Sequence, residues 1–119
     1  MPTAESPCPC GRDSSFGACC APFLAGEPAP TPERLMRSRY TAFVVGDVQY
    51  LLATWHPGTR PDSLDLDPEM QWAGLEIIDV LDGGEGDKRG VVEFAASYRN
   101  AGSPTLHVQR ERSRFVRQS

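Results

Sequence analysis

Apolar residues recur at helical spacing in the part of the chain that follows residue 31. The apolar side chains that share one helical face are Met36, Tyr40, Phe43 and Val44. Thr31 suits the N-cap, and the proline and glutamate that follow it suit the first turn. Gly46 can adopt the left-handed backbone that ends a helix. The pattern predicts a helix over residues 32–45 that packs this face against a core.

A second, shorter apolar pattern follows directly. Asp47 can cap a helix over residues 48–54. The apolar side chains of this helix are Val48, Leu51 and Leu52. A proline and a glycine break the helix after Trp55 and His56. Residues 57–69 are acidic and rich in turn-forming residues, so we expect a connection there.

The last third of the chain has the composition of strands. Residues 75–81, 91–98 and 105–116 are the segments that we expect to be extended, since the first two are rich in β-branched and aromatic residues. The intervening segments, 82–90 and 100–104, read as turns, the first being rich in Gly and Asp. Two helices followed by an antiparallel meander predict an α+β fold.

Composition limits the class of protein. The chain has 119 residues, 39% of them hydrophobic, which suits one compact domain with a small appendage. The net charge of −4 disfavours attraction of the whole protein to nucleic acid or to an anionic membrane. The N-terminus lacks the basic and apolar regions of a signal peptide, and no apolar run approaches the ~20 residues of a membrane span. We therefore expect a cytoplasmic protein.

All four cysteines lie in one short segment, as the close pairs Cys8, Cys10 and Cys19, Cys20. Disulfides within either pair are geometrically difficult, and a reducing compartment disfavours disulfides between the pairs. Two close pairs of thiols joined by a short loop supply the four soft ligands that zinc prefers. With every position filled by sulfur, no site is left for water, so the spacing predicts a structural zinc. Free or disulfide-bonded thiols are the alternative.

The cysteine spacing also carries a resemblance. Cys-Pro-Cys-Gly at 8–11 and Cys-Cys at 19–20, with eight residues between the cysteine pairs, resemble the SEC-C motif. This zinc-binding motif was first named from the C-terminal tail of the SecA translocation ATPase. The gap is lysine-rich in many such motifs, whereas here it holds one arginine and no lysine. The resemblance implies a protein partner for the zinc motif, and the missing lysines weaken the carry-over of binding to acidic partners or ribosomal RNA.

Three further motifs resemble the YchJ-like family of bacterial proteins and occur in the family's order. They are Leu-Met-Arg-Ser-Arg-Tyr-Thr-Ala-Phe at 35–43, Tyr-Leu-Leu-Ala-Thr-Trp-His-Pro at 50–57 and Glu-Arg-Ser-Arg-Phe at 111–115. The resemblance implies a nuclear-transport-factor-two-like (NTF2-like, cystatin-like) fold. In that fold a curved antiparallel sheet is wrapped by helices around a conical pocket. The resemblance brings no biochemical activity with it.

These patterns divide the chain into a zinc-binding motif over 1–24, a proline-rich linker over 25–31 and an α+β domain over 32–119. We expect the prolines to separate the motif from the domain, so that the domain stays folded without the metal. Members of the family usually continue into a further strand, and this chain ends at Ser119. We therefore expect the domain to lack a terminal strand and to self-associate through strand 105–116.

The first helix and its successor supply three candidate pocket residues. Arg39 can either pair with a buried structural partner or hold an anion in the pocket, whereas we expect a structural role for Arg37. Trp55 and His56 can line the pocket mouth, with His56 as an acid or base near neutral pH. Alternatively, Trp55 lies in the core and His56 caps the end of its helix.

The last predicted strand supplies the fourth candidate. Alternation places Arg110, Arg112 and Arg114 on one face. That face is either solvated and paired with the acidic residues of 62–93, or it is a ligand-binding wall. The family resemblance favours a binding role for Arg112.

Two classes of function follow from these candidates. The first is a protein-interaction or ligand-binding module, in which the zinc motif contacts a protein partner and the cone holds a small apolar or anionic ligand. The second is a small enzyme that transfers a proton in the manner of an isomerase or dehydratase, with His56 as base and Arg39 or Arg112 holding an anionic group. The filled zinc site and the lack of a recognisable nucleophile–base pair favour the first class.

Overall fold

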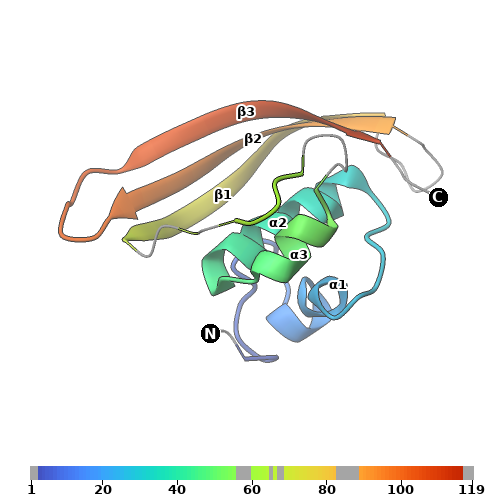
Figure 1. Ribbon diagram of the computed structural model, residues 1–119, viewed down its shortest axis with the longest axis horizontal. Coiled ribbons are helices and arrows are strands. Elements are labelled where there is room, and N and C mark those ends of the chain that lie inside the picture. Colours follow the sequence, from blue (N-terminus) through green and yellow to red (C-terminus); the bar gives the residue numbers. More distant parts are fainter. Residues whose placement is uncertain (1–2, 56–59, 65, 67–68, 83–88, 117–119) are drawn as a thin grey trace.

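The structure is a computed structural model that describes residues 3–55, 60–64, 66, 69–82 and 89–116. Its elements are η1 (Phe16–Ala18), α1 (Ala21–Leu24), α2 (Pro32–Val45), α3 (Val48–Ala53), β1 (Met70–Leu81), β2 (Arg89–Asn100) and β3 (His107–Val116). The strands form one antiparallel sheet in the order β1-β2-β3. The helices and the N-terminal segment lie on one side of this sheet (Figure 1). The predicted α+β fold is confirmed.

α2 spans the predicted residues, and α3 ends one residue before its predicted end. The Thr31 side chain accepts a hydrogen bond from the backbone N–H of Arg34, and Gly46 ends α2 with a φ of 80°. The Asp47 side chain accepts a hydrogen bond from the backbone N–H of Tyr50 at the start of α3. These caps satisfy backbone groups that have no partner within the helix. No helix in the described part of the chain is long and apolar enough to cross a membrane.

The buried stripe of α2 differs from the predicted one. Val44 is 39% exposed, so its placement in the predicted core face was wrong. The buried positions are Ser38, Tyr40, Thr41 and Ala42. The stripe is rotated because α2 contacts the sheet on one side and α1 and α3 on others. Small side chains fit this crowded position, and the Ser38 hydroxyl donates a hydrogen bond to the carbonyl of Leu35.

The sheet is longer than the sequence predicts at its first strand. β1 begins at Met70, five residues before the predicted start at 75. Irregularities between Trp72 and Gly74 and between Ile77 and Asp79 interrupt its pairing with β2. Each inserted residue shifts the alternation of inward and outward side chains, which hides the strand pattern in the sequence. β3, by contrast, pairs with β2 in continuous register and lies at the other edge of the described sheet.

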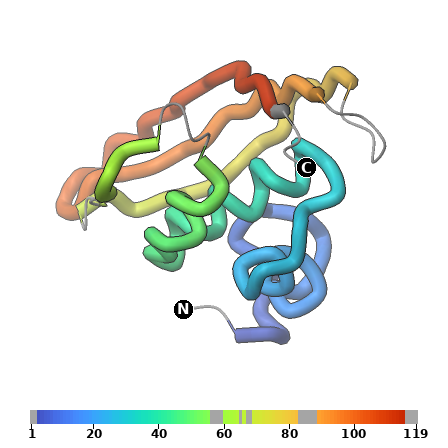
Figure 2. The backbone as a smooth tube through the Cα atoms, turned by 45° about the vertical axis from the view of Figure 1, so that its right-hand side comes forward, coloured from blue at the N-terminus to red at the C-terminus, as the bar shows by residue number. Residues whose placement is uncertain are grey.

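The core joins the cysteine segment to the rest of the molecule. All four cysteines pack in one buried cluster with Tyr40 of α2 and with Val92, Phe94 and Ala96 of β2. Figure 2 shows the N-terminal segment beside α2, on the helical side of the sheet. The expectation that the prolines of the linker separate the motif from the domain is therefore wrong, because the two share a core. The exact boundaries of the three predicted parts stay a prediction.

Gly46 and Gly74 form a matched pair of sites for testing the α2 cap. A Cβ would meet no atom within 4 Å at either site, but only Gly46 has a positive φ. We expect Gly46→Ala to destabilise the fold by about 1 kcal/mol, because an L side chain is disfavoured in the left-handed region. Gly74→Ala should stay within about 0.5 kcal/mol of the wild type. Urea denaturation measures both, and equal losses would contradict this account of the cap.

Candidate metal centre

The four cysteine side chains form a compact cluster of sulfur atoms. All four Sγ atoms lie within 4.8 Å of one another, and every cysteine is at most 4% exposed. Sγ of Cys19 lies 3.7 Å from that of Cys10 and 3.9 Å from that of Cys20. A disulfide would need about 2.0 Å, so the thiols are free. A tetrahedral ion with bonds of about 2.3 Å to sulfur would separate its ligands by about 3.8 Å. The cluster therefore fits a single metal ion.

The backbone around the cysteines is folded into tight turns. The N–H of Gly11 donates to the carbonyl of Cys8 over 3.1 Å, and Gly11 has a φ of 84°, which a glycine adopts without strain. The N–H of Cys8 donates to the carbonyl of Ser14, which closes the loop between the cysteine pairs. Cys19 and Cys20 follow η1 directly, and the N–H of Cys19 donates to the carbonyl of Phe16. Local hydrogen bonds thus bring the two cysteine pairs together.

A buried hydroxyl on α2 completes the surroundings of the sulfur atoms. Thr41 is fully buried, and its Oγ1 donates a hydrogen bond to Cys20 Sγ over 3.3 Å. The same oxygen lies 3.9 Å from Cys8 Sγ. A hydroxyl that donates to sulfur stabilises the thiolate form that binds metal. The sequence gives no signal for this contact, since Thr41 lies 21 positions from Cys20.

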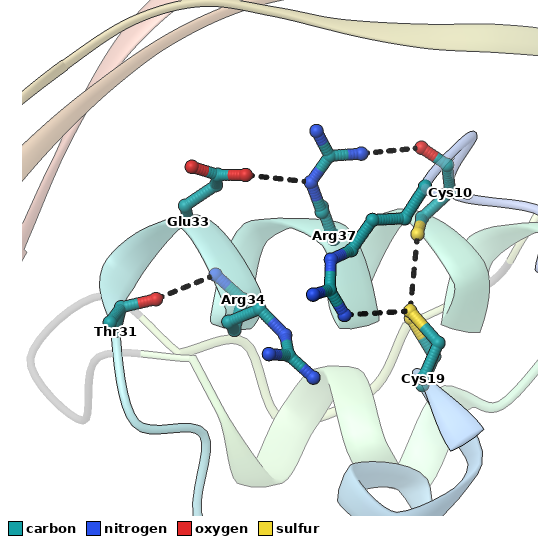
Figure 3. Close-up of polar contacts among 8 residues, drawn as sticks. Cys10, Cys19, Thr31, Glu33, Arg34 and Arg37 are labelled. Carbon is teal, nitrogen blue, oxygen red and sulfur yellow. Dashed lines mark hydrogen bonds and ion pairs between the residues drawn. The ribbon is translucent and has the colours of Figure 1, made fainter. Parts of the chain in front are cut away.

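Arginine side chains tie the cysteine loop to α2. Arg37 Nη1 donates to the carbonyl of Cys10 over 2.9 Å, and Arg37 Nε donates to Glu33 Oε2 over 3.0 Å (Figure 3). Arg12 Nη1 lies 3.9 Å from Cys19 Sγ. The structural role expected for Arg37 is confirmed, and the structure adds the Cys10 carbonyl as its second partner. These contacts hold the loop against the helix and place positive charge beside the thiols.

The thiols influence one another's protonation. A hydrogen bond from the Cys20 thiol lowers the pKa of Cys10 to about 5. The same hydrogen bond, with burial, raises the pKa of Cys20. Burial, followed by the negative charge of Cys10, raises the pKa of Cys19. The protein alone therefore stabilises one thiolate in the cluster but resists further negative charge, which a bound cation would compensate.

Arg112 belongs to an ion-pair network on the outer face of the sheet. Its Nη1 lies 2.9 Å from Glu93 Oε1 and 3.6 Å from Asp79 Oδ2. Arg110 also donates to Glu93, and hydrogen bonds from Arg110 and then Arg112 lower the pKa of Glu93. Glu93 alternates along β2 with the buried Val92 and Phe94, so these pairs point away from the helices. Ion pairs of this kind are expected under the first of the two alternatives, in which the arginine face is solvated.

Arg39 and Trp55 lie together, apart from Arg112. The guanidinium carbon of Arg39 lies 5.3 Å from the centroid of the Trp55 ring, in cation–π geometry. Arg39 belongs to α2, Trp55 follows α3, and both residues are partly buried. The prediction for His56 lies outside the described residues. The structure thus unites two of the four pocket candidates and does not bring Arg112 to them.

Two variants of Thr41 test its part in metal binding. Thr41→Val keeps the shape of the side chain but removes the hydroxyl, so we expect metal affinity to fall by about 10–100-fold. Thr41→Ser keeps the donor and should stay close to the wild type. Competition between the protein and a chelator for cobalt(II), followed by the thiolate-to-metal absorption, measures both affinities. Equal losses in the two variants would assign the effect to packing and not to the hydrogen bond.

Comparison with known proteins places these features in a family. The model of the family described as "YchJ, middle NTF2-like domain" matches residues 31–119. The chain is 58% identical to a UPF0225 protein of Streptomyces coelicolor over 118 residues, which cover 98% of this chain and 89% of that protein. It is 51% identical to a UPF0225 protein of Deinococcus radiodurans over 112 residues, which cover 92% of this chain and 79% of the relative.

Two solved structures extend the similarity to the cysteine segment. A SEC-C motif containing protein from Rhodopseudomonas palustris is 35% identical, with a TM-score of 0.80 over 93% of this chain and 88% of the other. A second SEC-C motif containing protein, from Psychrobacter arcticus, is 30% identical, with a TM-score of 0.76 over 95% and 73% of the two chains. These matches confirm the expected NTF2-like fold and the SEC-C resemblance. The chain belongs to the YchJ-like, UPF0225 family and carries a SEC-C cysteine cluster before an NTF2-like domain.

Proposed function

We propose that this protein is a zinc-stabilised binding module. In this proposal a structural zinc at Cys8, Cys10, Cys19 and Cys20 fixes the N-terminal segment on the α+β domain. The fixed segment then contacts a protein partner, and the domain holds a small ligand. The observation that carries the proposal is the buried four-sulfur cluster within the common core.

The donor set favours zinc as the ion. Four cysteine sulfur atoms in tetrahedral reach are typical of structural zinc sites, and hard cations such as magnesium or calcium take oxygen ligands instead. The separations of at most 4.8 Å leave room for one ion between the sulfur atoms. When bound, zinc would supply cross-linking of the four thiolates and neutralise their charge. Four protein ligands leave no open position for a substrate, which supports a structural role.

The surface of the cysteine segment supports a protein partner. Gly11, Asp13 and Ala18 are exposed on the loop that joins the two cysteine pairs. Since this loop is closed by local hydrogen bonds and would be cross-linked by zinc, a partner would meet a preorganised surface. Preorganised loops lose less conformational entropy on binding than mobile ones do.

Among the described residues, Arg112 does not support the alternative of a small proton-transferring enzyme. That alternative needs Arg39 or Arg112 to hold an anionic group beside His56. Arg112 instead contacts carboxylates on the outer face of the sheet, and His56 is not among the described residues.

Self-association through strand 105–116 stays a prediction, and β3 is an edge strand of the described sheet, as that prediction requires.

Elemental analysis of the purified protein tests the metal. We expect one zinc per chain in the wild type and a loss of zinc in Cys19→Ser. Because the cluster lies in the common core, this variant should also lower the melting temperature of the whole domain by more than about 10 °C. Ala18→Ser introduces the same side chain at an exposed neighbouring position and serves as the control.

Three results would contradict the proposal. The first is a zinc content well below one per chain together with oxidised thiols, and the second is a different resident metal. The third is a Cys19→Ser variant that loses zinc yet has the melting temperature of Ala18→Ser. The metal would then contribute nothing to the stability of the common core. A pull-down with the wild type and Cys19→Ser side by side then tests the partner, since binding through the zinc motif must be lost with the metal.

A further inference from the structure

Arg39 carries a shielded charge that no described group neutralises. Its Nε is buried and has no hydrogen-bond partner, and it is the one buried side-chain nitrogen or oxygen in this state among the described residues. Neither an ion pair nor a hydrogen bond joins its guanidinium to another described residue. The Trp55 ring, 5.3 Å from the guanidinium carbon, supplies its stacking partner.

Neighbouring arginines show how this protein otherwise treats the same side chain. Arg37, two positions away on α2, has both a carboxylate and a backbone carbonyl as acceptors. Arg112 is exposed to water and still pairs with two carboxylates. Arg39 is more shielded than Arg112 and has neither kind of acceptor among the described residues. A guanidinium in this state lacks the compensation that buried charges in proteins ordinarily have.

The one described group whose charge would favour the Arg39 cation is the Tyr50 phenol. Burial raises the pKa of Tyr50, so this phenol is neutral at physiological pH. Its oxygen already forms a 2.7 Å hydrogen bond with the Ser38 hydroxyl. Burial, in turn, lowers the pKa of Arg39 itself, which is a sign that water solvates the cation poorly. An outside anion at the Nη atoms, which are not among the buried unpartnered atoms, would supply the missing charge.

We propose that Arg39 and Trp55 form a binding site for the carboxylate of a small monoanionic acid whose apolar body packs on the indole ring. The proposal rests on the binding-module function above and names its ligand class. A carboxylate matches the planar fork of a guanidinium and carries one charge, as the site does. A phosphate dianion needs several donors, and the described surroundings of Arg39 are a tryptophan ring and a phenol.

The second tryptophan of the chain makes a direct test available. In Trp72→Phe, tryptophan fluorescence comes from Trp55 alone, and the replacement keeps an aromatic ring against Tyr40 and Tyr98. The Trp72→Phe variant is loaded with zinc and titrated with cyclohexanecarboxylate, with the neutral cyclohexanecarboxamide of the same shape, and with inorganic phosphate. We expect a saturable change in Trp55 emission with the carboxylate only.

Two arginine variants in the same background locate the site. Arg39→Lys keeps the charge but removes the fork, so carboxylate affinity should fall by about tenfold or more. Arg34→Lys is the matched control, because Arg34 also stacks on an aromatic ring, with its guanidinium carbon 5.2 Å from the centroid of Phe23. This control should bind like its parent.

Each contrary outcome overturns the proposal. Equal binding of carboxylate and carboxamide would exclude a role for the charge, and preferential binding of phosphate would exclude the monocarboxylate class. The absence of saturation, or equal losses in Arg39→Lys and Arg34→Lys, would exclude the site. If Arg39→Lys does not fold, the comparison of the three probes in Trp72→Phe still decides. Zinc content measured on the same samples separates the two proposals, since a fully loaded protein that ignores the carboxylate refutes only this one.

Discussion

Four cysteine sulfur atoms inside the hydrophobic core connect the N-terminal segment to the sheet. Without them, residues 3–24 would contribute short turns, one 3-10 helix and a four-residue helix, too little to bury a core of their own. With them, the segment packs on Tyr40 of α2 and on the buried face of β2. The contacts from Thr41 and Arg37 run from α2 to the cysteines, so the helix and the cluster position each other.

This arrangement explains which features the sequence predicts and which it does not. The helix caps at Thr31 and Gly46 and the cysteine pairs depend on residues close together in the chain, and they lie where predicted. Val44 was misplaced because helical spacing shows that a face is apolar but not how many partners surround the helix. β1 was predicted too short because its irregularities break the alternation on which the pattern depends.

The contacts that define the candidate site were beyond sequence reasoning for a related reason. Thr41 and Arg37 reach cysteines 21 and 27 positions away, and nothing local distinguishes them from other polar residues of α2. The same distinction between local and long-range information applies to the arginines. The sequence left two readings open for the strand arginines, a solvated face paired with acidic residues or a ligand-binding wall, and Arg110 and Arg112 form such pairs. That Arg39 would be shielded beside Trp55 without an acceptor in the described part of the chain depends on how α2 and the end of α3 pack, which only the fold shows.

A metal ion held by the four cysteines would stabilise the whole domain and not the cysteine segment alone. Hydrogen exchange of backbone amides, measured before and after a chelator removes the metal, tests it most directly. We expect amides of β2 around Val92 and Phe94 to lose protection together with those of residues 7–22, since both surround the same sulfur atoms. Loss of protection confined to residues 7–22, with β2 unchanged, would contradict it.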